Sequence, residues 1–470
     1  MTSRYIFLLP AALCLAYPAP PAWAQWEPEM RLVVSDSMAM TSPNNARCLA
    51  AGPGGSIQVV WWDTRNGFGE IYTKCSSDCG ITWAPDTRLT FDPARSLYPT
   101  IAVSGPKVHV AWSEDRDGNY EIYYKRSTDE GGTWSPDTRL TYAVNNGWFS
   151  SLAAVGDDVH VVWWDYRDRD HEVYYKRSTD GGETWSPDTR LTFAPHDSWY
   201  PSISASGATV HAAWWDNRDG NYEIYYKRST DNGFSWGPDV RLTSDSGWSS
   251  TPCIASSGDR VYLAWEDDRN GAGEIYYKFS TDDGATWSPD ARLTFDPGWS
   301  VMPSIWASGA KVHLVWDDDR DGNEEIYYRC SSDSGLTWSG EERLSYGRYN
   351  STYPSISAID SMVHVVWTDS RSGNPEIYYA RNPTGNSGNE ERTEAGGQRL
   401  EVRVMAKPDP FVSYATVPGR ETEYFEVYDV SGRKVGTYLG DRIGQNIGPG
   451  VYFLRPVDKK AAPVRIVKIR

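Results

Sequence analysis

The sequence predicts an all-β protein: a seven-bladed β-propeller closed by its N-terminal strand and followed by a small C-terminal β-sandwich. One arginine recurs every 51 residues, at Arg65, Arg116, Arg167, Arg218, Arg269, Arg320 and Arg371. A period of this length, kept seven times, is typical of a repeat architecture. Each repeat holds about four short runs rich in β-branched and aromatic residues, separated by Gly, Asp and Asn. Four strands per repeat are typical of propeller blades.

The composition agrees with a large core rich in aromatic side chains. The chain has 470 residues, of which 14% are aromatic, including 23 Trp and 30 Tyr. Its formal net charge is −17 and its pI is about 4.9. Because such a surface repels phosphates, we expect neither nucleic acid nor an anionic membrane as the partner.

Residues 1–24 have the pattern of an export signal. Arg4 supplies a positive start, an apolar run follows, and Ala22-Trp23-Ala24 resembles a cleavage site. The apolar run is too short to span a membrane, and we find no other candidate span. We therefore expect a mature protein that begins near Gln25 and is secreted or held on the outer-membrane surface.

The five cysteines of the mature chain follow no disulfide or metal-binding spacing. Cys75 and Cys79 lie on either side of one predicted turn, so they could bridge in an oxidising compartment. The alternative is that all five are small buried hydrophobic residues. The sequence leaves this choice open.

The first mature residues predict how the ring closes. The segment from Trp26 to Leu32 matches the end of a repeat, Trp83 to Leu89, and the seventh repeat lacks this last strand. We expect the N-terminal segment to supply the missing strand, which would leave no open sheet edge. The propeller then covers residues 25–381.

The turn between the third and fourth strands has the pattern S-x-D-x-G-x-x-W in six repeats. Ser and Asp side chains can bond nearby backbone amides, Gly accepts a positive φ, and Trp anchors the turn. The pattern resembles the Asp-box, or bacterial neuraminidase repeat, of the sialidase superfamily. That resemblance implies a propeller with these turns on the face away from the active site. We expect a structural role for the six aspartates, Asp78, Asp129, Asp180, Asp231, Asp282 and Asp333.

The opposite face, called the top face below, should collect the arginine-containing loops and the segments before each first strand. Aromatic rings can cover apolar sugar faces while Asp and Arg bond hydroxyls, so this composition favours glycan binding. The candidate residues are Tyr98, Trp148, Trp199, Trp248, Trp299, Tyr353, Asp165, Arg167, Asp216, Arg218, Asp318 and Arg320. A competing interpretation makes the arginines structural, through ion pairs such as Arg116–Glu121 and Arg218–Glu223 across one hairpin.

The family resemblance also implies a hydrolytic alternative. Sialidases use three arginines on the substrate carboxylate, a Tyr activated by a Glu, and an Asp as acid and base. The family's early Arg-Ile-Pro motif is absent here, and the residues that depart from the repeat do not form such a set: Arg169, His171, Trp306, Arg348 and Tyr349. We favour a glycan-binding propeller, with an exo-α-sialidase-type glycosidase as the alternative and a protein-interaction scaffold as a further one.

No metal or other cofactor is predicted. Five histidines recur at one position per repeat, His109, His160, His211, His313 and His364. Side chains spread around a ring cannot converge on one metal, so we expect core histidines. The run from Asp317 to Gly322 resembles the opening of a calcium loop, but Tyr328 stands where that loop needs Glu. The alternative there is a solvated acidic turn.

Residues 382–399 are polar and lack periodicity, as expected of a linker. Residues 400–470 return to short alternating strands, as expected of a β-sandwich. The segments PDPF, VYDVSGRKV and GVYFLR resemble a type IX secretion C-terminal sorting domain, although that family usually carries Asn where PDPF has Asp. The resemblance implies the secretion machinery as a partner. A plain accessory sandwich is the alternative.

Overall fold

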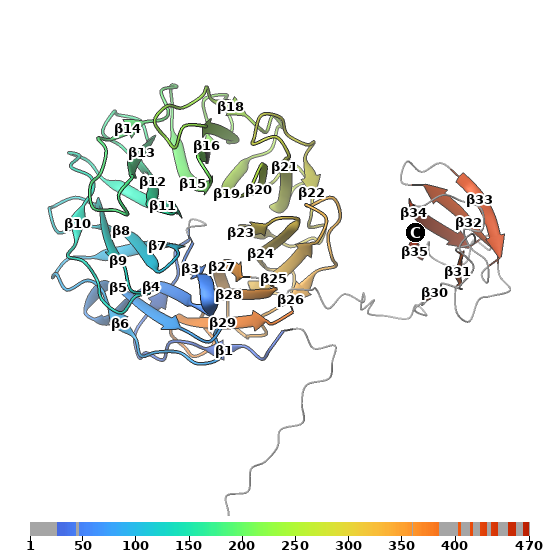
Figure 1. Ribbon diagram of the computed structural model, residues 1–470, viewed down its shortest axis with the longest axis horizontal. Coiled ribbons are helices and arrows are strands. Elements are labelled where there is room, and N and C mark those ends of the chain that lie inside the picture. Colours follow the sequence, from blue (N-terminus) through green and yellow to red (C-terminus); the bar gives the residue numbers. More distant parts are fainter. Residues whose placement is uncertain are drawn as a thin grey trace, which may run out of the picture. The chain divides into compact units, whose positions relative to one another are not determined.

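The seven repeats fold into seven antiparallel sheets arranged in a ring, as the sequence period predicts (Figure 1). The computed structural model describes residues 26–43, 47–359 and 361–384, together with six strands beyond residue 400. The predicted signal peptide and almost all of the predicted linker lie outside the described residues. The fold prediction is confirmed for the propeller.

Each blade follows the chain outward from the axis, from its first strand to its fourth. The strands of the first three blades are β2 (Ala39–Met40), β3 (Leu49–Ala51), β4 (Ile57–Asn66), β5 (Phe68–Ser76) and β6 (Thr87–Arg88); β7 (Ser96–Ser104), β8 (Lys107–Glu114), β9 (Glu121–Ser127) and β10 (Thr138–Arg139); β11 (Gly147–Val155), β12 (Asp158–Asp165), β13 (Glu172–Ser178) and β14 (Thr189–Arg190). A short 3-10 turn, η1 (Pro53–Gly55), joins β3 to β4.

The next three blades have the same four-strand order. Their strands are β15 (Ser198–Ser206), β16 (Thr209–Asp216), β17 (Glu223–Ser229) and β18 (Val240–Arg241); β19 (Ser249–Ser257), β20 (Arg260–Asp267), β21 (Glu274–Ser280) and β22 (Ala291–Arg292); β23 (Ser300–Ser308), β24 (Lys311–Asp318), β25 (Glu325–Ser331) and β26 (Glu342–Arg343). The seventh blade contains β27 (Ser351–Ile359), β28 (Met362–Asp369), β29 (Glu376–Asn382) and β1 (Met30–Arg31).

The strand β1 closes the ring, as the sequence predicts. Met30 pairs with Tyr379 and Arg31 with Tyr378 in β29. Trp26 packs edge-on against Tyr328 of the sixth blade at 5.0 Å between ring centroids. The Asp-box tryptophans pack in the same way, for example Trp83 on Tyr379 at 5.0 Å. The N-terminal segment therefore supplies both the strand and the tryptophan that the seventh repeat lacks.

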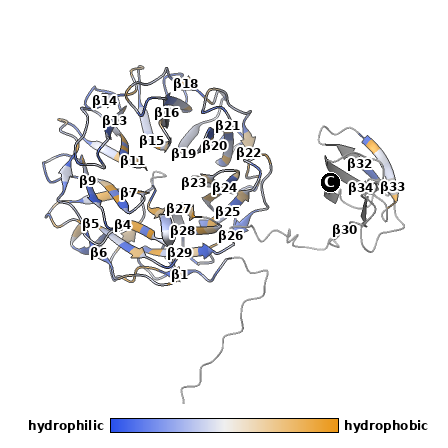
Figure 2. Ribbon diagram, viewed as in Figure 1, coloured by the Kyte–Doolittle hydropathy of each residue, from blue (hydrophilic) through white to orange (hydrophobic). Residues whose placement is uncertain are grey.

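The hydrophobic core lies between the blades. Strands such as β4 and β7 combine polar residues with consecutive apolar ones (Figure 2), and consecutive residues of both strands are buried, so each strand offers apolar side chains to the blades on both sides. One fully buried tryptophan from each second strand enters each interface between blades: Trp61, Trp112, Trp163, Trp214, Trp265, Trp316 and Trp367. A repeated interface explains why the tryptophan recurs at the sequence period.

The Asp-box turns lie at the end of the blade that carries the hairpin between the first two strands. In the third blade the Gly181 amide donates to Asp157 O of that hairpin at 2.8 Å. Within the turn, Ser178 Oγ donates to Asp180 Oδ1 at 2.7 Å, and the Gly182 amide donates to Ser178 Oγ at 2.8 Å. The turn is thus held by its own serine and aspartate.

The histidines of the second strands support these turns. His160 Nδ1 bonds Tyr175 Oη at 2.7 Å, and that tyrosine packs under the Asp-box tryptophan Trp236 of the next blade. Burial lowers the pKa of His160 to about 4, which keeps the ring neutral. The histidines occupy the core, as predicted. The described cysteines are free thiols, so Cys75 and Cys79 do not bridge in this structure.

The C-terminal unit, Glu390–Arg470, is compact by itself. Its described strands form a two-stranded sheet, β30 (Arg403–Met405) and β31 (Tyr414–Thr416), and a four-stranded antiparallel sheet. The four strands, in the order β33-β32-β34-β35, are β32 (Tyr424–Asp429), β33 (Lys434–Leu439), β34 (Gly450–Pro456) and β35 (Val464–Ile469). The predicted sandwich stays a prediction. Within the described residues, no helix is long and apolar enough to span a bilayer.

Candidate functional site

Two kinds of loop meet on the top face of each blade. The Asp268 amide, after β20, donates to Trp248 O, before β19, at 3.1 Å. The same bond joins Asp319 to Trp299 in the next blade, also at 3.1 Å. The arginine-containing loops and the segments before the first strands therefore share this face, opposite to the Asp-box turns.

The loop arginines are structural, but the predicted Arg–Glu pairing is wrong. Arg218 bonds Asp216, two residues before it, through Nε at 2.8 Å, and bonds Asp239 through Nη1 at 2.7 Å. The amide of Arg218 also donates to Asp216 at 2.9 Å. The aspartate forms a tight turn with the loop backbone and so captures the arginine that follows it, which spacing alone does not reveal.

The glutamate that was expected to pair with this arginine has another partner. Glu223 accepts from Arg241 at 2.7 Å and from Thr243 Oγ1 at 2.5 Å, both from the end of the same blade. In the second blade, likewise, Glu121 pairs with Arg139 at 2.9 Å, while Arg116 pairs with Glu114 and Asp137. The carboxylates and arginines of the loops are thus used to tie strands together.

These ion pairs limit the hydrogen bonds that the predicted polar site residues can offer to a ligand. Each of the three predicted Asp–Arg pairs forms a salt bridge with its aspartate side chain buried: Asp165–Arg167, Asp216–Arg218 and Asp318–Arg320. Each arginine also lies over a tyrosine ring, as Arg218 does over Tyr225 at 4.2 Å. Most hydrogen-bonding groups of these pairs are used within the propeller, but Arg167 Nε is buried and has no hydrogen-bond partner among the described residues.

A β-bulge near the start of each innermost strand from the second blade to the seventh re-aims one side chain. In β15 the register shifts between Trp199 and Ser202, and Tyr200 adopts a φ of 48°. The residues in this left-handed conformation are Tyr98, Phe149, Tyr200, Thr251, Met302 and Tyr353. Such a backbone costs roughly 1–3 kcal/mol per residue and persists where the surrounding structure enforces it, often at functional sites.

The bulge residues of the second, third and fourth blades form one continuous aromatic surface. Ring centroids lie 4.4 Å apart for Tyr98 and Phe149, and 5.0 Å apart for Phe149 and Tyr200. Trp148 lies 5.9 Å from Tyr98, and Trp199 lies 5.2 Å from Trp215. We call these residues the aromatic arc: Tyr98, Trp148, Phe149, Trp199, Tyr200 and Trp215.

In the fifth and sixth blades, carboxyl groups replace the tryptophan that Trp215 represents in the fourth blade. Glu266 and Asp317 occupy the position that holds Trp62, Trp164 and Trp215 in other repeats. Burial raises the pKa of Glu266 to about 7, and repulsion from Asp268 and Asp267 adds to the rise. Burial and repulsion from Glu324 and Glu266 raise the pKa of Asp317 well above its usual range.

The surroundings of these carboxyls identify what a ligand would meet. Thr251 Oγ1 donates to Glu266 Oε2 at 3.3 Å, and Asn350 Nδ2 donates to Glu324 Oε2 at 2.7 Å. Asp317 Oδ1 is buried and accepts from no donor among the described residues. We call Glu266, Asp317 and Glu324 the acidic group. Burial raises the pKa of the bulge residue Tyr353, and repulsion from Asp317 and Glu324 adds to the rise.

The six aromatic residues predicted from the sequence fall at three different positions. Tyr98 and Tyr353 are bulge residues, and Trp148 and Trp199 precede the bulge by one residue inside β11 and β15. Trp248 and Trp299 lie just before β19 and β23, with 57% and 48% of their surfaces exposed. The prediction that all six precede the first strand is therefore wrong for four of them.

The sequence analysis did not identify Phe149, Tyr200 or Glu266, and it considered Asp317 only as part of a possible calcium loop. Aligning the repeats strictly at 51 residues shows two positions that differ from blade to blade while their neighbours stay constant. One position is occupied by Trp62, Ser113, Trp164, Trp215, Glu266, Asp317 and Thr368. The other is the position of the bulge residues. Residues that are the same in every repeat stabilise the blades. The positions that vary between repeats are therefore the ones that could have indicated a single binding site.

The described residues contain no group of three His, Cys, Asp or Glu side chains arranged to hold a metal. In the loop considered for calcium, Asp319 accepts from the Trp299 amide at 2.7 Å and Asp318 from Arg320 at 2.7 Å. Asp321 accepts from Tyr327 and Arg343. These carboxylates therefore serve separate protein donors.

Comparisons with known proteins agree with this architecture. The family described as "BNR/Asp-box repeat" matches residues 176–187. A protein named "Sialidase" from Bacteroides fragilis (strain YCH46) is 23% identical over 299 residues, which cover 53% of this chain and 54% of that protein. The match thus spans about half the length of this curated relative.

Solved structures resemble the propeller at low sequence identity. Polysaccharide lyase Uly1 superposes with a TM-score of 0.51 at 9% identity, covering 77% of this chain and 100% of that one. The NanB sialidase of Streptococcus pneumoniae gives 0.44 at 12% identity, covering 77% and 71%. The α-L-arabinofuranosidase of Fusarium graminearum with arabinobiose gives 0.43 at 14% identity, covering 58% and 89%.

Fold and repeat together define the class of this protein: it is an Asp-box, seven-bladed β-propeller. The relative named "Sialidase" is similar to this chain over 53% of its length. Among the described residues that line the cavity on the propeller axis, Arg47 is the one arginine.

Proposed function

We propose that the top face binds glycans, with the aromatic arc as the sugar platform and the acidic group as the source of hydrogen bonds to hydroxyls. The observation that carries this proposal is the contact of Tyr98, Phe149 and Tyr200 across three blades, each on a left-handed backbone. Flat aromatic surface beside convergent polar groups is the usual composition of a carbohydrate site.

The choice of a glycan over a protein partner follows from the composition of the face. The arc is bordered by carboxyls at Glu266 and Asp317, whereas the centre of a protein interface is depleted in acidic residues. Half-exposed tryptophans beside these groups, Trp248 and Trp299, add ring faces on which a sugar can stack. A protein-interaction scaffold remains the outcome favoured if no glycan binds.

A glycan array probed with the full chain tests the proposal. The double substitution Trp148→Ala with Trp199→Ala should lower the affinity for the best array ligand by about tenfold or more. Phe193→Ala is the matched control, because Phe193 is an aromatic residue with 70% of its surface exposed that lies outside the arc. Equal loss in both variants, or no array ligand, would overturn the assignment.

A second candidate function, glycoside cleavage, is favoured by the buried carboxyls Glu266 and Asp317. A carboxyl that stays protonated near neutral pH can act as a general acid in glycoside cleavage. Turnover of a fluorogenic sialoside and a fluorogenic arabinofuranoside separates the sialidase-type alternative from other specificities. Glu266→Gln and Asp317→Asn should each abolish any turnover while keeping glycan binding.

Export is part of the same proposal. We infer a signal peptide at residues 1–24 and a type IX sorting domain at residues 400–470, with the secretion machinery as its partner and the cell surface or medium as the destination. Without residues 400–470, the propeller should not cross the outer membrane and should stay in the periplasm. Appearance of the truncated protein in the medium would contradict the sorting role, and N-terminal sequencing tests cleavage near Gln25.

A further inference from the structure

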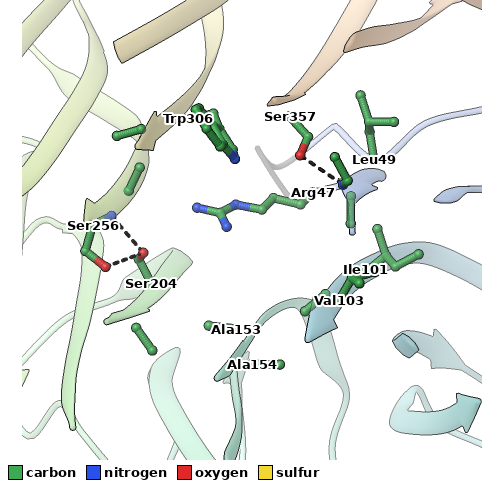
Figure 3. A pocket seen from close by; sticks show the side chains of 16 residues that line it. Arg47, Leu49, Ile101, Val103, Ala153, Ala154, Ser204, Ser256, Trp306 and Ser357 are labelled. Carbon is green, nitrogen blue, oxygen red and sulfur yellow. Dashed lines mark hydrogen bonds between the residues drawn. The ribbon is translucent and has the colours of Figure 1, made fainter. Parts of the chain in front are cut away.

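The innermost strands enclose a cavity on the propeller axis with a volume of about 150 Å³. Its wall consists mainly of alanine, with single valine, leucine and isoleucine residues and five polar or aromatic side chains (Figure 3). These five are Arg47, Ser204, Ser256, Trp306 and Ser357. No carboxylate lines the cavity among the described residues.

Arg47 enters this cavity because the first blade departs from the repeat. Its innermost strand is split into β2 and β3, and Arg47 lies between them, just before β3. Figure 3 shows its side chain extended across the open space toward the opposite wall. There Nη2 donates to Ile254 O of the fifth blade at 3.2 Å.

The guanidinium of Arg47 has no carboxylate partner among the described residues, unlike the seven loop arginines. Arg320, for comparison, forms salt bridges with Asp318, Asp296 and Glu341. Burial lowers the pKa of Arg47, although an arginine side chain stays protonated in proteins. A charge held in such a place is unfavourable unless an opposite charge joins it.

The other polar groups of the cavity also have hydrogens to donate. Ser357 Oγ accepts from the Ala51 amide at 3.1 Å, which leaves its own hydrogen to donate. Ser204 and Ser256 share one hydrogen bond of 2.8 Å, so one of their two hydroxyl hydrogens is left over. Trp306, which replaces the small residue of other repeats, brings an indole N–H to the same wall. Such a set of donors is complementary to an anion.

We propose that the axial cavity binds one small oxyanion or carboxylate, held by Arg47 with the hydroxyls of Ser204 or Ser256 and Ser357 and the indole N–H of Trp306. A water molecule occupies about 30 Å³ of liquid, so the cavity has room for a sulfate, phosphate or acetate ion. The bound anion neutralises Arg47 and thereby stabilises the first blade against the opposite wall. This site is separate from the aromatic arc and does not depend on glycan binding.

The test measures the melting temperature of the full chain in sulfate, phosphate or acetate, against chloride at equal ionic strength. An ion that binds the folded protein alone raises Tm by mass action, here by about 2 °C or more. Arg47→Met should lose this rise, and Arg47→Lys should keep part of it. Because oxyanions also stabilise proteins by exclusion, only the difference between wild type and Arg47→Met counts.

Two further measurements complete the test. In chloride alone, Arg47→Met should melt at the same temperature as wild type or higher, because an unpaired charge has been removed. Equilibrium dialysis with labelled sulfate should show one ion per chain in the wild type. Equal responses of both proteins to the oxyanions, or no bound sulfate, phosphate or acetate, would overturn the proposal. An Arg47-dependent rise with glucuronate but not glucose would assign the anion to a sugar acid; its absence would assign it to free ions.

Discussion

The contact between an Asp-box glycine and the preceding blade should control the stability of the ring. Gly182 has a φ of 85°, and a Cβ there would lie 2.6 Å from Cζ of Tyr124. Tyr124 is fully buried, and its Oη bonds His109 Nδ1 at 2.6 Å, so the ring cannot move away without breaking that bond. Gly182→Ala therefore combines three effects: backbone strain, overpacking and a lost hydrogen bond.

The magnitude follows from these three effects. A left-handed backbone costs a non-glycine residue about 1–2 kcal/mol, overpacking about 1–3 kcal/mol, and the hydrogen bond about 1 kcal/mol. We expect Gly182→Ala to lower the free energy of unfolding by about 3–6 kcal/mol. Gly156, in the same blade, has a φ of 61°, and a methyl group added to its Cα would meet no neighbouring atom within 4 Å. Gly156→Ala should therefore cost only the strain, about 1–2 kcal/mol.

Urea denaturation followed by far-UV circular dichroism compares the two variants directly. A lower midpoint for Gly182→Ala than for Gly156→Ala, at equal slope, would measure the contact with Tyr124. Equal midpoints would refute the reasoning, because the two glycines differ in contact and share the positive φ. The φ requirement of the Asp-box glycine is predictable from the sequence, and the structure adds the tyrosine of the neighbouring blade.

Three other perturbations follow from the structure. Trp26→Ala should lower the free energy of unfolding by about 2–4 kcal/mol, measured by denaturation, since it removes the packing on Tyr328 that closes the ring. Glu266→Gln should stabilise the protein at high pH, because the raised pKa of about 7 disfavours the ionised form of Glu266 in the fold. Wild-type stability therefore falls as pH rises from about 4.5 through 7, and a gain of about 2 kcal/mol at pH 8 should vanish at about pH 4. Stability should also fall as pH drops from about 6.5 toward 4, because His160 is protonated in the unfolded chain but stays neutral when buried in the fold. His160→Gln should therefore lose less of its denaturation midpoint between about pH 7 and about pH 5 than the wild type does. Equal losses in the two proteins would contradict this.

Much of the fold could be predicted because the same interactions recur in each blade. The recurring Arg, Trp and Asp-box residues each fill one structural place, and Trp26 could be matched to Trp83 by its surroundings in the sequence. The ion pairs could not be assigned by spacing, because the aspartate before Arg218 captures it through a loop turn. A sequence period shows which residues are equivalent, but it does not show which side chains contact one another in the folded protein.

The candidate site was harder to predict because it depends on departures from the period. Tyr98 and Tyr353 were found, whereas Phe149 and Tyr200 share their position and were missed. Arg47 lies in the first blade, where the innermost strand is split, and it stands at the repeat position that holds Tyr98, Phe149 and Tyr200 in the next three blades. A site that uses each blade differently is encoded in the positions that fail to repeat.

The most direct test of the central claim is a crystal structure of the full chain with its best array ligand. We expect a sugar ring stacked on Tyr98, Phe149 or Tyr200, with hydroxyls bonded to Glu266, Asp317 or Glu324. A ligand found only on the Asp-box face, or only at the outer edge of the blades, would contradict it.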